Sequence, residues 1–138
     1  MATNPAESYE RYFVPALFGP CATRLVELIQ PRPGERVLDL ACGTGIVARQ
    51  VASRVAPNGT VSALDVNPHM LTVARAAAEA EGAKIAFLEG NAENLPFDDG
   101  AFDLVTCQHA FQFFPNPDAV AREIARVLAP GGRVAVAT

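Results

Sequence analysis

The stretch from Val37 to Gly45, VLDLACGTG, decides the fold of this chain. It overlaps a short, mostly apolar run, Arg36–Leu40, which predicts a buried strand. Gly43 and Gly45 follow where we expect the strand to turn into a helix from Thr44 to Val55. Glycines at such a turn let the backbone bend tightly and approach a ligand, and the helix beyond it offers unpaired N–H groups.

Strand and helix patterns alternate along the rest of the chain. Further strands are predicted at Thr60–Asp65, Lys84–Leu88, Phe102–Cys107 and Arg133–Thr138. The helices between them are predicted from Asn67-Pro68 to a C-cap at Gly82, and from Asn116-Pro117 along an apolar stripe of Val120, Ile124, Val127 and Leu128. Pro130, Gly131 and Gly132 are expected to turn the chain into the last strand.

This alternation predicts an α/β fold with a doubly wound, mostly parallel sheet. The strands are apolar nearly throughout, as in sheets that helices cover on both faces. We expect residues 35–138 to form the ligand-binding core and residues 1–34 to form N-terminal helices that cover its site. Within the latter, Ala6–Gln30 predicts one or two helices, broken near Gly19-Pro20. Ligands of such folds bind at the carboxyl ends of the strands.

The composition of the 138 residues limits the function. Half of the residues are hydrophobic and 19% are charged, which is typical of a soluble globular domain. The net charge of -4 disfavours a nucleic-acid partner. No apolar run reaches the roughly 18–20 residues of a membrane span, and the N-terminus is unlike a secretory signal. Three widely spaced cysteines predict neither disulfides nor a zinc site, so we expect a cytoplasmic protein.

Asp65 ends the second predicted strand, twenty positions after Gly45. A carboxylate there can accept hydrogen bonds from both hydroxyls of a ribose, although a plain helix-capping aspartate is the alternative. The glycines could likewise form a merely structural turn. Together the two features favour an adenosine-containing ligand. The run from Gly43 to Ala48 also fits the loose dinucleotide fingerprint, so NAD remains an alternative.

Asp39 distinguishes a nicotinamide dinucleotide from a cationic ligand. A pyrophosphate at the glycine turn would lie awkwardly close to a carboxylate four residues before Gly43. The same carboxylate suits the amino group or sulfonium of S-adenosylmethionine (SAM). Electrostatics therefore favour SAM over NAD.

Four segments resemble, in order, the motifs of class I SAM-dependent methyltransferases. They are VLDLACGTG at 37–45, ALDVNPHML at 63–71, EGNAENLPF at 89–97 and the long run from Phe102 to Val134. The sequence is most similar to small-molecule enzymes grouped with the ubiquinone/menaquinone methyltransferases, from Tyr9 to Thr138. The resemblance implies a Rossmann-like core with strand order 3-2-1-4-5, C-terminally short because the family's later strands are absent.

The resemblance also implies a set of cofactor-binding residues. Those for the methionine part of SAM are Asp39, Gly43, Gly45 and the backbone near Gln108, and Ala41 is a further cofactor-binding residue. Those for the adenosine part are Asp65 at the ribose, Val66 and Met70 along the adenine, and Asn91 and Ala92 at its edge. Tyr9 and Phe13 would cover the cofactor. Where Asn91 stands the family usually has aspartate, so we expect adenine binding to survive, weakened by ~1 kcal/mol.

Other residues near the strand ends have competing interpretations. His109 follows the fourth strand and could be a general base, or a wall or capping residue. Cys42 and Cys107 are expected in the core and not as nucleophiles. The aromatic cluster that follows, Phe111, Phe113 and Phe114, could form core, pocket wall or substrate contact.

The resulting hypothesis is a methyltransferase that acts on a small molecule, with S-adenosylhomocysteine (SAH) as product. Its alternatives are a SAM-binding module without turnover, because the substrate half is missing, and an NAD-binding fragment. Val134 and Val136 should face one side of the fifth strand, Ala135 and Ala137 the other, and one side lacks a helix. We therefore expect a homodimer through this exposed strand.

Overall fold

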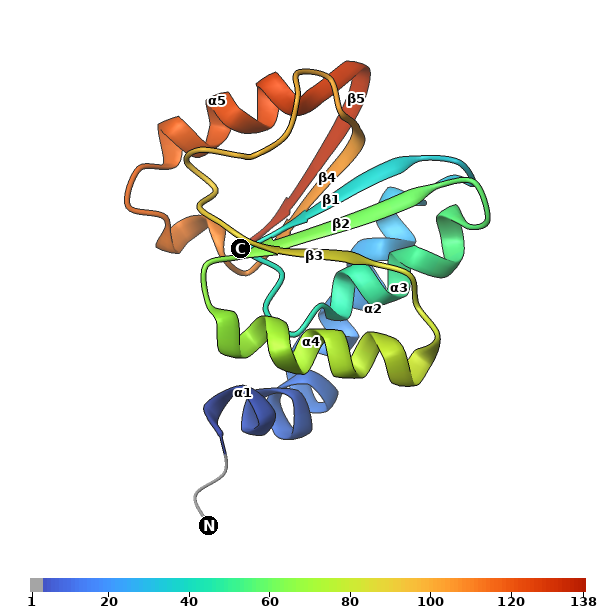
Figure 1. Cartoon of the computed structure of the whole chain (residues 1–138), viewed down its shortest axis with the longest axis vertical. Coiled ribbons are helices and arrows are strands. Elements are labelled where there is room, and N and C mark those ends of the chain that lie inside the picture. Colours follow the sequence, from blue (N-terminus) through green and yellow to red (C-terminus); the bar gives the residue numbers. More distant parts are fainter. Residues whose placement is uncertain (1–3) are drawn as a thin grey trace.

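The computed structural model describes residues 4–138, so the first three residues of the predicted N-terminal part lie outside the described residues. Five parallel strands form one sheet in the order β3-β2-β1-β4-β5, which confirms the predicted fold class and strand order (Figure 1). Their bounds are β1 Arg36–Leu40, β2 Thr60–Asp65, β3 Ala86–Glu89, β4 Phe102–Gln108 and β5 Leu128–Ala137.

β5 differs most from its prediction, because it begins at Leu128 and not at Arg133. Leu128 already pairs with Phe102 of β4, and the register shifts before Arg133 pairs with Leu104. The residues predicted as a turn, 130–132, therefore lie within an irregularity of the strand. β3 begins two residues later than predicted, at Ala86.

Three helices connect the strands, and their ends follow the predicted caps. They are α3 Ile46–Val55, α4 Pro68–Glu81 and α5 Pro117–Val127. The side chains of Asn67 and Asn116 accept hydrogen bonds from the first turns of α4 and α5, and Gly82 ends α4 in the left-handed region. α3 starts two residues later than predicted, because the preceding Gly45 has φ 81° and cannot be part of a helix.

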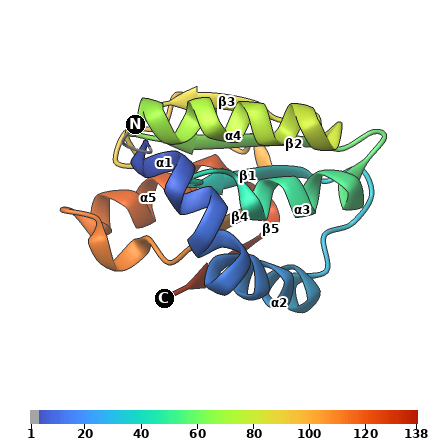
Figure 2. The same ribbon diagram turned by 90° about the horizontal axis from the view of Figure 1, so that it is seen from below.

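The N-terminal segment is helical without a break from Pro5 to Ile29. It consists of α1 Pro5–Ser8, the π-helical η1 Tyr9–Phe18 and α2 Gly19–Ile29. The predicted break at Gly19-Pro20 is therefore wrong. Pro20 lies just after the point where the π-helix η1 gives way to the α-helix α2, so only the helix type changes there. Figure 2 shows this segment lying across the domain.

This same segment bears on the expectation of no membrane span. By length and composition Pro5–Ile29 could cross a membrane, contrary to the estimate from apolar runs alone. Core helices of soluble proteins and N-terminal signal sequences pass the same test. Glu10 within it forms an ion pair with Arg49 of α3, which favours packing on the domain.

Helices cover both faces of the sheet and create two cores. On one face α2, α3 and α4 pack on the strands, around Val26, Val51, Leu71 and Val37. On the other face α5 packs with Leu38 and Leu40 of β1. Since neighbouring residues of β1 enter different cores, the apolar sequence of this strand follows from its burial on both sides.

The two faces of β5 are unequal, as expected. Ala135 and Ala137 pack against the core beneath α2. Val134 and Val136, on the opposite face, are 49% and 44% exposed. The uncovered face of the fifth strand is therefore its valine face.

Candidate cofactor site

The turn after β1 is held in place by backbone hydrogen bonds and by the freedom of its glycines. The Cys42 N–H donates to the carbonyl of Leu64 at 3.0 Å. Gly43 and Gly45 have φ of 56° and 81°, which side chains rarely adopt. A Cβ on Gly45 would also lie 3.2 Å from the ring of Phe87. The second glycine is thus required for packing as well as for backbone conformation.

Asp65 at the end of β2 is fixed by two backbone donors. The Gly43 N–H donates to Oδ2 at 2.8 Å, and the Asn67 N–H donates to Oδ1 at 2.9 Å. Each carboxylate oxygen keeps a further acceptor position. The charge is therefore held at the glycine turn with room for two hydroxyl donors, which fits the vicinal hydroxyls of a ribose.

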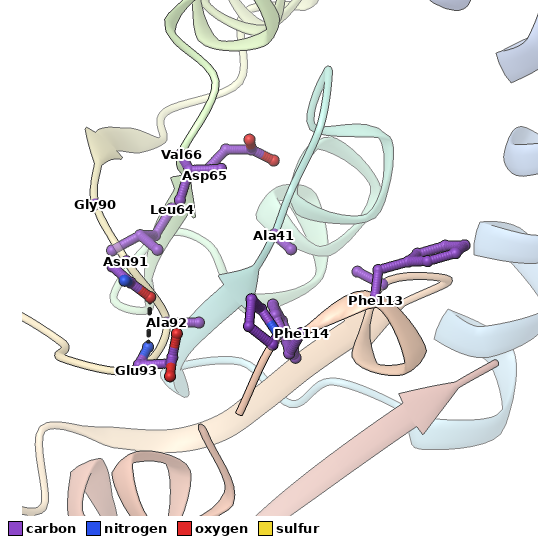
Figure 3. Close-up of a pocket in the computed structure, with 12 residues that line it drawn as sticks. Ala41, Leu64, Asp65, Val66, Gly90, Asn91, Ala92, Glu93, Phe113 and Phe114 are labelled. Carbon is purple, nitrogen blue, oxygen red and sulfur yellow. Dashed lines mark hydrogen bonds between the residues drawn. The ribbon is translucent and has the colours of Figure 1, made fainter. Parts of the chain in front are cut away.

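A cavity of about 330 Å³ opens beside Asp65. Figure 3 shows Asp65 and Asn91 along one side of it, with Ala41 and Phe114 across. Most of its lining is apolar, which suits a flat aromatic base. The predicted residues that line it are Ala41, Asp65, Val66, Asn91 and Ala92. Phe113 and Phe114, predicted as core, pocket wall or substrate contact, also line it. The lining residues that the sequence did not predict are Leu64, Gly90, Glu93, Ala110 and Pro115.

Asn91 is already engaged in its own loop. Its Oδ1 accepts from the Glu93 N–H at 2.9 Å, and its carbonyl accepts from the Asn94 N–H. The oxygen expected to accept from an adenine amino group is therefore shared, and the Nδ2 donors do not replace it. The expectation that asparagine accepts from adenine more weakly than aspartate would is consistent with this engagement and stays a prediction.

A second, smaller cavity of about 80 Å³ adjoins the first, since Ala41 and Ala110 line both. Tyr9, Asp39, Gln108 and His109 line it together with the glycine turn. Three buried side-chain atoms around it have no hydrogen-bond partner among residues 4–138: Asp39 Oδ2, Gln108 Oε1 and His109 Nε2. Unpaired buried polar atoms are costly, so this group indicates a site for a polar ligand.

Asp39 lies at the floor of this cavity and is 2% exposed. Burial raises the pKa of its carboxyl to about 7. The hydrogen bond from the Thr106 hydroxyl lowers this pKa, whereas the nearby charge of Asp65 raises it further. That hydrogen bond measures 2.8 Å. A cationic ligand would favour the ionised form, whereas a pyrophosphate would oppose it.

Tyr9 of η1 covers the same cavity. A Cβ on Gly43 would lie 3.8 Å from the Tyr9 hydroxyl, so the phenol lies over the glycine turn. Burial, with the charges of Glu10, Asp65 and Asp39, raises the pKa of Tyr9 to about 12. The carboxyl groups of Glu10, Asp65 and Asp39 thus all lie near the Tyr9 hydroxyl, so the site attracts positive charge.

His109 has a strained backbone, with φ of 54°, and Ala41 across the cavity has φ of 52°. Side chains rarely tolerate this region, and such outliers cluster at functional sites. The His109 N–H donates to the carbonyl of Ala137 at 2.6 Å, which holds the residue at the end of β4. Its ring lies 5.6 Å from that of Phe18.

The buried thiols are core residues. Burial raises the pKa of Cys42 far above its usual range and that of Cys107 to about 12. A thiol that does not ionise is a poor nucleophile. The prediction that both belong to the core is confirmed.

Three of the predicted residues do not line either cavity. Gly45 ends the turn directly before α3, Met70 is half-buried on α4, and Phe13 is 56% exposed, with its ring 6.3 Å from that of Tyr9. Sequence reasoning also missed Glu10, which bonds Thr44 of the glycine turn. No local motif marks such a contact, because it joins segments far apart in the sequence.

The residues present fit SAM. The larger cavity and Asp65 suit its adenosine, and the unpaired atoms around the smaller cavity suit its charged amino acid part. Fold and site together define a nucleotide-cofactor domain of the doubly wound α/β class.

Comparison with known proteins specifies the class. A family described as "Methyltransferase domain" matches residues 37–132. The chain belongs to this family, and SAM is the cofactor that goes with it.

Individual relatives agree with this membership. The chain is 46% identical to a demethylmenaquinone methyltransferase of Thermus thermophilus over 82% of its length, and covers 51% of that enzyme. It is 40% identical to a nocamycin O-methyltransferase of Saccharothrix syringae, covering 85% of the chain and 42% of the enzyme. A SAM-dependent methyltransferase from Aquifex aeolicus shares the fold, with TM-score 0.84 and 20% identity, over 97% of this chain and 72% of that one. The chain thus spans about half the length of the curated relatives it matches.

Proposed function

We propose that this chain is the cofactor-binding part of an enzyme that transfers a methyl group from SAM to a small-molecule acceptor. One observation carries the proposal. The smaller cavity, where polar atoms of Asp39, Gln108 and His109 lack partners among the described residues, adjoins the larger cavity, where Asp65 could accept from the hydroxyls of a ribose. The relatives act on small molecules by name, and the net charge of -4 favours such an acceptor over a nucleic acid.

The proposed roles follow from the geometry. Asp39 would hold the cationic end of SAM, Asp65 the ribose, and Asn91 with Ala92 the adenine edge. Residues 1–34 would cover the cofactor, with Tyr9 above the glycine turn. When bound, SAM supplies a methyl group activated by a positively charged sulfur. Holding an acceptor in line with that methyl group is the main contribution the protein has to make.

His109 is the proposed general base. Its Nε2 is buried without a hydrogen-bond partner in the described part of the chain, and the residue lines the smaller cavity, so this atom could accept a proton from the acceptor's nucleophile. The strained backbone at this position supports a functional role.

A turnover assay tests this function. The protein is mixed with SAM and a short-chain demethylmenaquinol, the acceptor type suggested by a relative's name, or a simple phenol, and SAH release is followed. With SAM at a saturating concentration, so that any weaker cofactor binding is compensated, we expect release that falls at least tenfold in His109→Ala. Binding of SAM without release for either acceptor would support the alternative of a binding module.

We also propose that a second copy covers the valine face of β5. Two half-exposed valines beside the free edge of an outer strand favour pairing. Light scattering at several concentrations tests this with Val136→Lys. Leu28→Lys, at another exposed apolar residue, is the matched control. A monomer at every concentration, or a dimer that Val136→Lys leaves intact, would contradict the proposal.

We place the protein in the cytoplasm, because its three free thiols, two of them buried, suit a reducing compartment. Labelling the protein in cells and fractionating them tests this placement.

A further inference from the structure

The carboxylate of Glu10 fastens the N-terminal helices to the glycine turn. One oxygen accepts from the Thr44 hydroxyl at 2.5 Å, and the other accepts from Nη2 of Arg49 at 2.7 Å. Thr44 lies between the two glycines of the turn, and Arg49 lies in the first half of α3. A single side chain of η1 thus holds both the turn and the helix that follows it.

These contacts are shielded from water. Thr44 is 1% exposed, the Arg49 side chain 5% and the Glu10 side chain 24%. Arg49 also pairs through Nη1 with Glu81 at 2.6 Å. Pairs that are shielded in this way are screened only weakly by salt. Without the charge of Glu10, the buried Arg49 keeps its pair with Glu81, whose side chain is 50% exposed. Glu10 is therefore the more shielded of the two acidic partners of Arg49, and it comes from η1.

The helix that Glu10 holds is poorly secured between Glu10 and Phe18. η1 is π-helical, a rare form that occurs mainly at functional sites, and Pro15 within it has no N–H to donate. Tyr12, Phe13 and Leu17 are 50% or more exposed, and Val14 is the buried residue of the helix. Gln108 Nε2 donates to the Phe18 carbonyl at the end of η1, and between Glu10 and Phe18 the buried side chain is that of Val14.

Tyr9 is the neighbour of Glu10 and covers the smaller cavity. Opening of η1 would therefore move the Tyr9 ring off the glycine turn. Glu10 and Tyr9 are adjacent in η1, so the Glu10 contacts also hold the helical turn that carries Tyr9.

We propose that Glu10 is a positioning residue that latches Tyr9 over the methionine side of the cofactor cavity. A bound cofactor then leaves only when the Glu10 contacts to Arg49 and Thr44 break. The inference rests on the proposed function, because it needs SAM or SAH in these cavities.

Release of SAH from the whole chain, measured by stopped-flow displacement, tests the latch. Glu10→Gln keeps the size of the side chain but removes its charge, and we expect the release rate to rise on the order of tenfold. Thr44→Val removes the other contact at nearly equal volume, and should raise the rate by a smaller factor. Glu7→Gln, an exposed acid of the same helical segment, is the matched control and should release SAH at the wild-type rate.

Hydrogen exchange separates latching from general destabilisation. In the wild type, SAH should slow amide exchange in residues 5–18, and in Glu10→Gln this protection should be lost while β1 and β4 stay protected. An unchanged release rate, or equal loosening of the sheet, would overturn the inference. Failure of the wild type to bind SAH at all would instead overturn the proposed function.

Discussion

Replacing Asp39 by asparagine should stabilise the free protein and weaken its cofactor binding. The carboxyl is buried, and one of its oxygens has no hydrogen-bond partner within residues 4–138. Burial raises its pKa from 3.8 to about 7. Asparagine has nearly the same shape and can still accept from the Thr106 hydroxyl. The change therefore removes the charge and little else.

The magnitude follows from the pKa. Between pH 4 and pH 7 the folded chain holds a proton that the unfolded chain has lost, so the free energy of unfolding falls as the pH rises through this range. A rise from 3.8 to about 7 corresponds to about 4 kcal/mol lost above pH 7. The unpaired amide of asparagine costs about 1–3 kcal/mol, so Asp39→Asn should gain roughly 1–3 kcal/mol at pH 8.

Urea unfolding at pH 4.5 and pH 8 measures this gain. We expect the variant to be more stable than the wild type at pH 8, and to lose that advantage at pH 4.5. Asp103→Asn is the control of opposite sign, since the hydrogen bonds from Arg36 lower the pKa of Asp103. A variant that is less stable than the wild type at pH 8, or gains equally at both pH values, would refute the reasoning.

The same variant should bind SAM roughly ten- to a hundredfold more weakly at pH 8, because the ligand's positive charge loses its acceptor. A variant that is more stable but binds its ligand more weakly shows that the original residue serves ligand binding at a cost in stability. Calorimetry on both proteins at one pH gives the ratio. Equal affinities would remove Asp39 from the site.

Three further changes test other parts of the site. Asp65→Ala should weaken SAH binding by about 2–3 kcal/mol, since two hydroxyl donors lose a charged acceptor; calorimetry measures the loss. Asn91→Asp should strengthen binding by about 1 kcal/mol in the same assay, because a second acceptor oxygen becomes free. Gly45→Ala should lower the free energy of unfolding in urea by about 1–3 kcal/mol, since φ is 81° and Phe87 lies 3.2 Å from the new Cβ.

A different result would contradict each of these three predictions. Wild-type affinity in Asp65→Ala would mean that the ribose lies elsewhere; Asp98→Ala, in an exposed loop, is the control. Weaker binding in Asn91→Asp would show that a donor is needed at this edge. An unfolding midpoint unchanged in Gly45→Ala would show that the turn adapts at no cost.

Patterns of neighbouring residues made most of the fold predictable. The order of the strands followed from the family resemblance, and the caps at Asn67, Asn116 and Gly82 from local chemistry. The wrong boundaries have tertiary causes. Leu128 joins β5 because Phe102 lies opposite it. Pro20 does not break the helix, and it lies where the helix type changes from π to α.

The candidate site was predictable where its residues follow strand ends. Asp39, Asp65 and His109 could be found because parallel strands bring their carboxyl ends to one edge. Glu10 could not, since its contacts with Thr44 and Arg49 arise only when the N-terminal helix folds back onto the turn. The sequence also could not predict that Gln108 Oε1 lacks a hydrogen-bond partner among the described residues, because this depends on every atom that surrounds it in the fold.

The central claim is that these cavities bind SAM and its product and exclude a dinucleotide. Isothermal titration of the whole chain with SAM, SAH and NAD under one set of conditions tests it most directly. The account predicts saturable binding of SAM and SAH, and no measurable heat from NAD at the same concentrations. Binding of NAD as tight as that of SAH, or no binding of SAM and SAH, would contradict it.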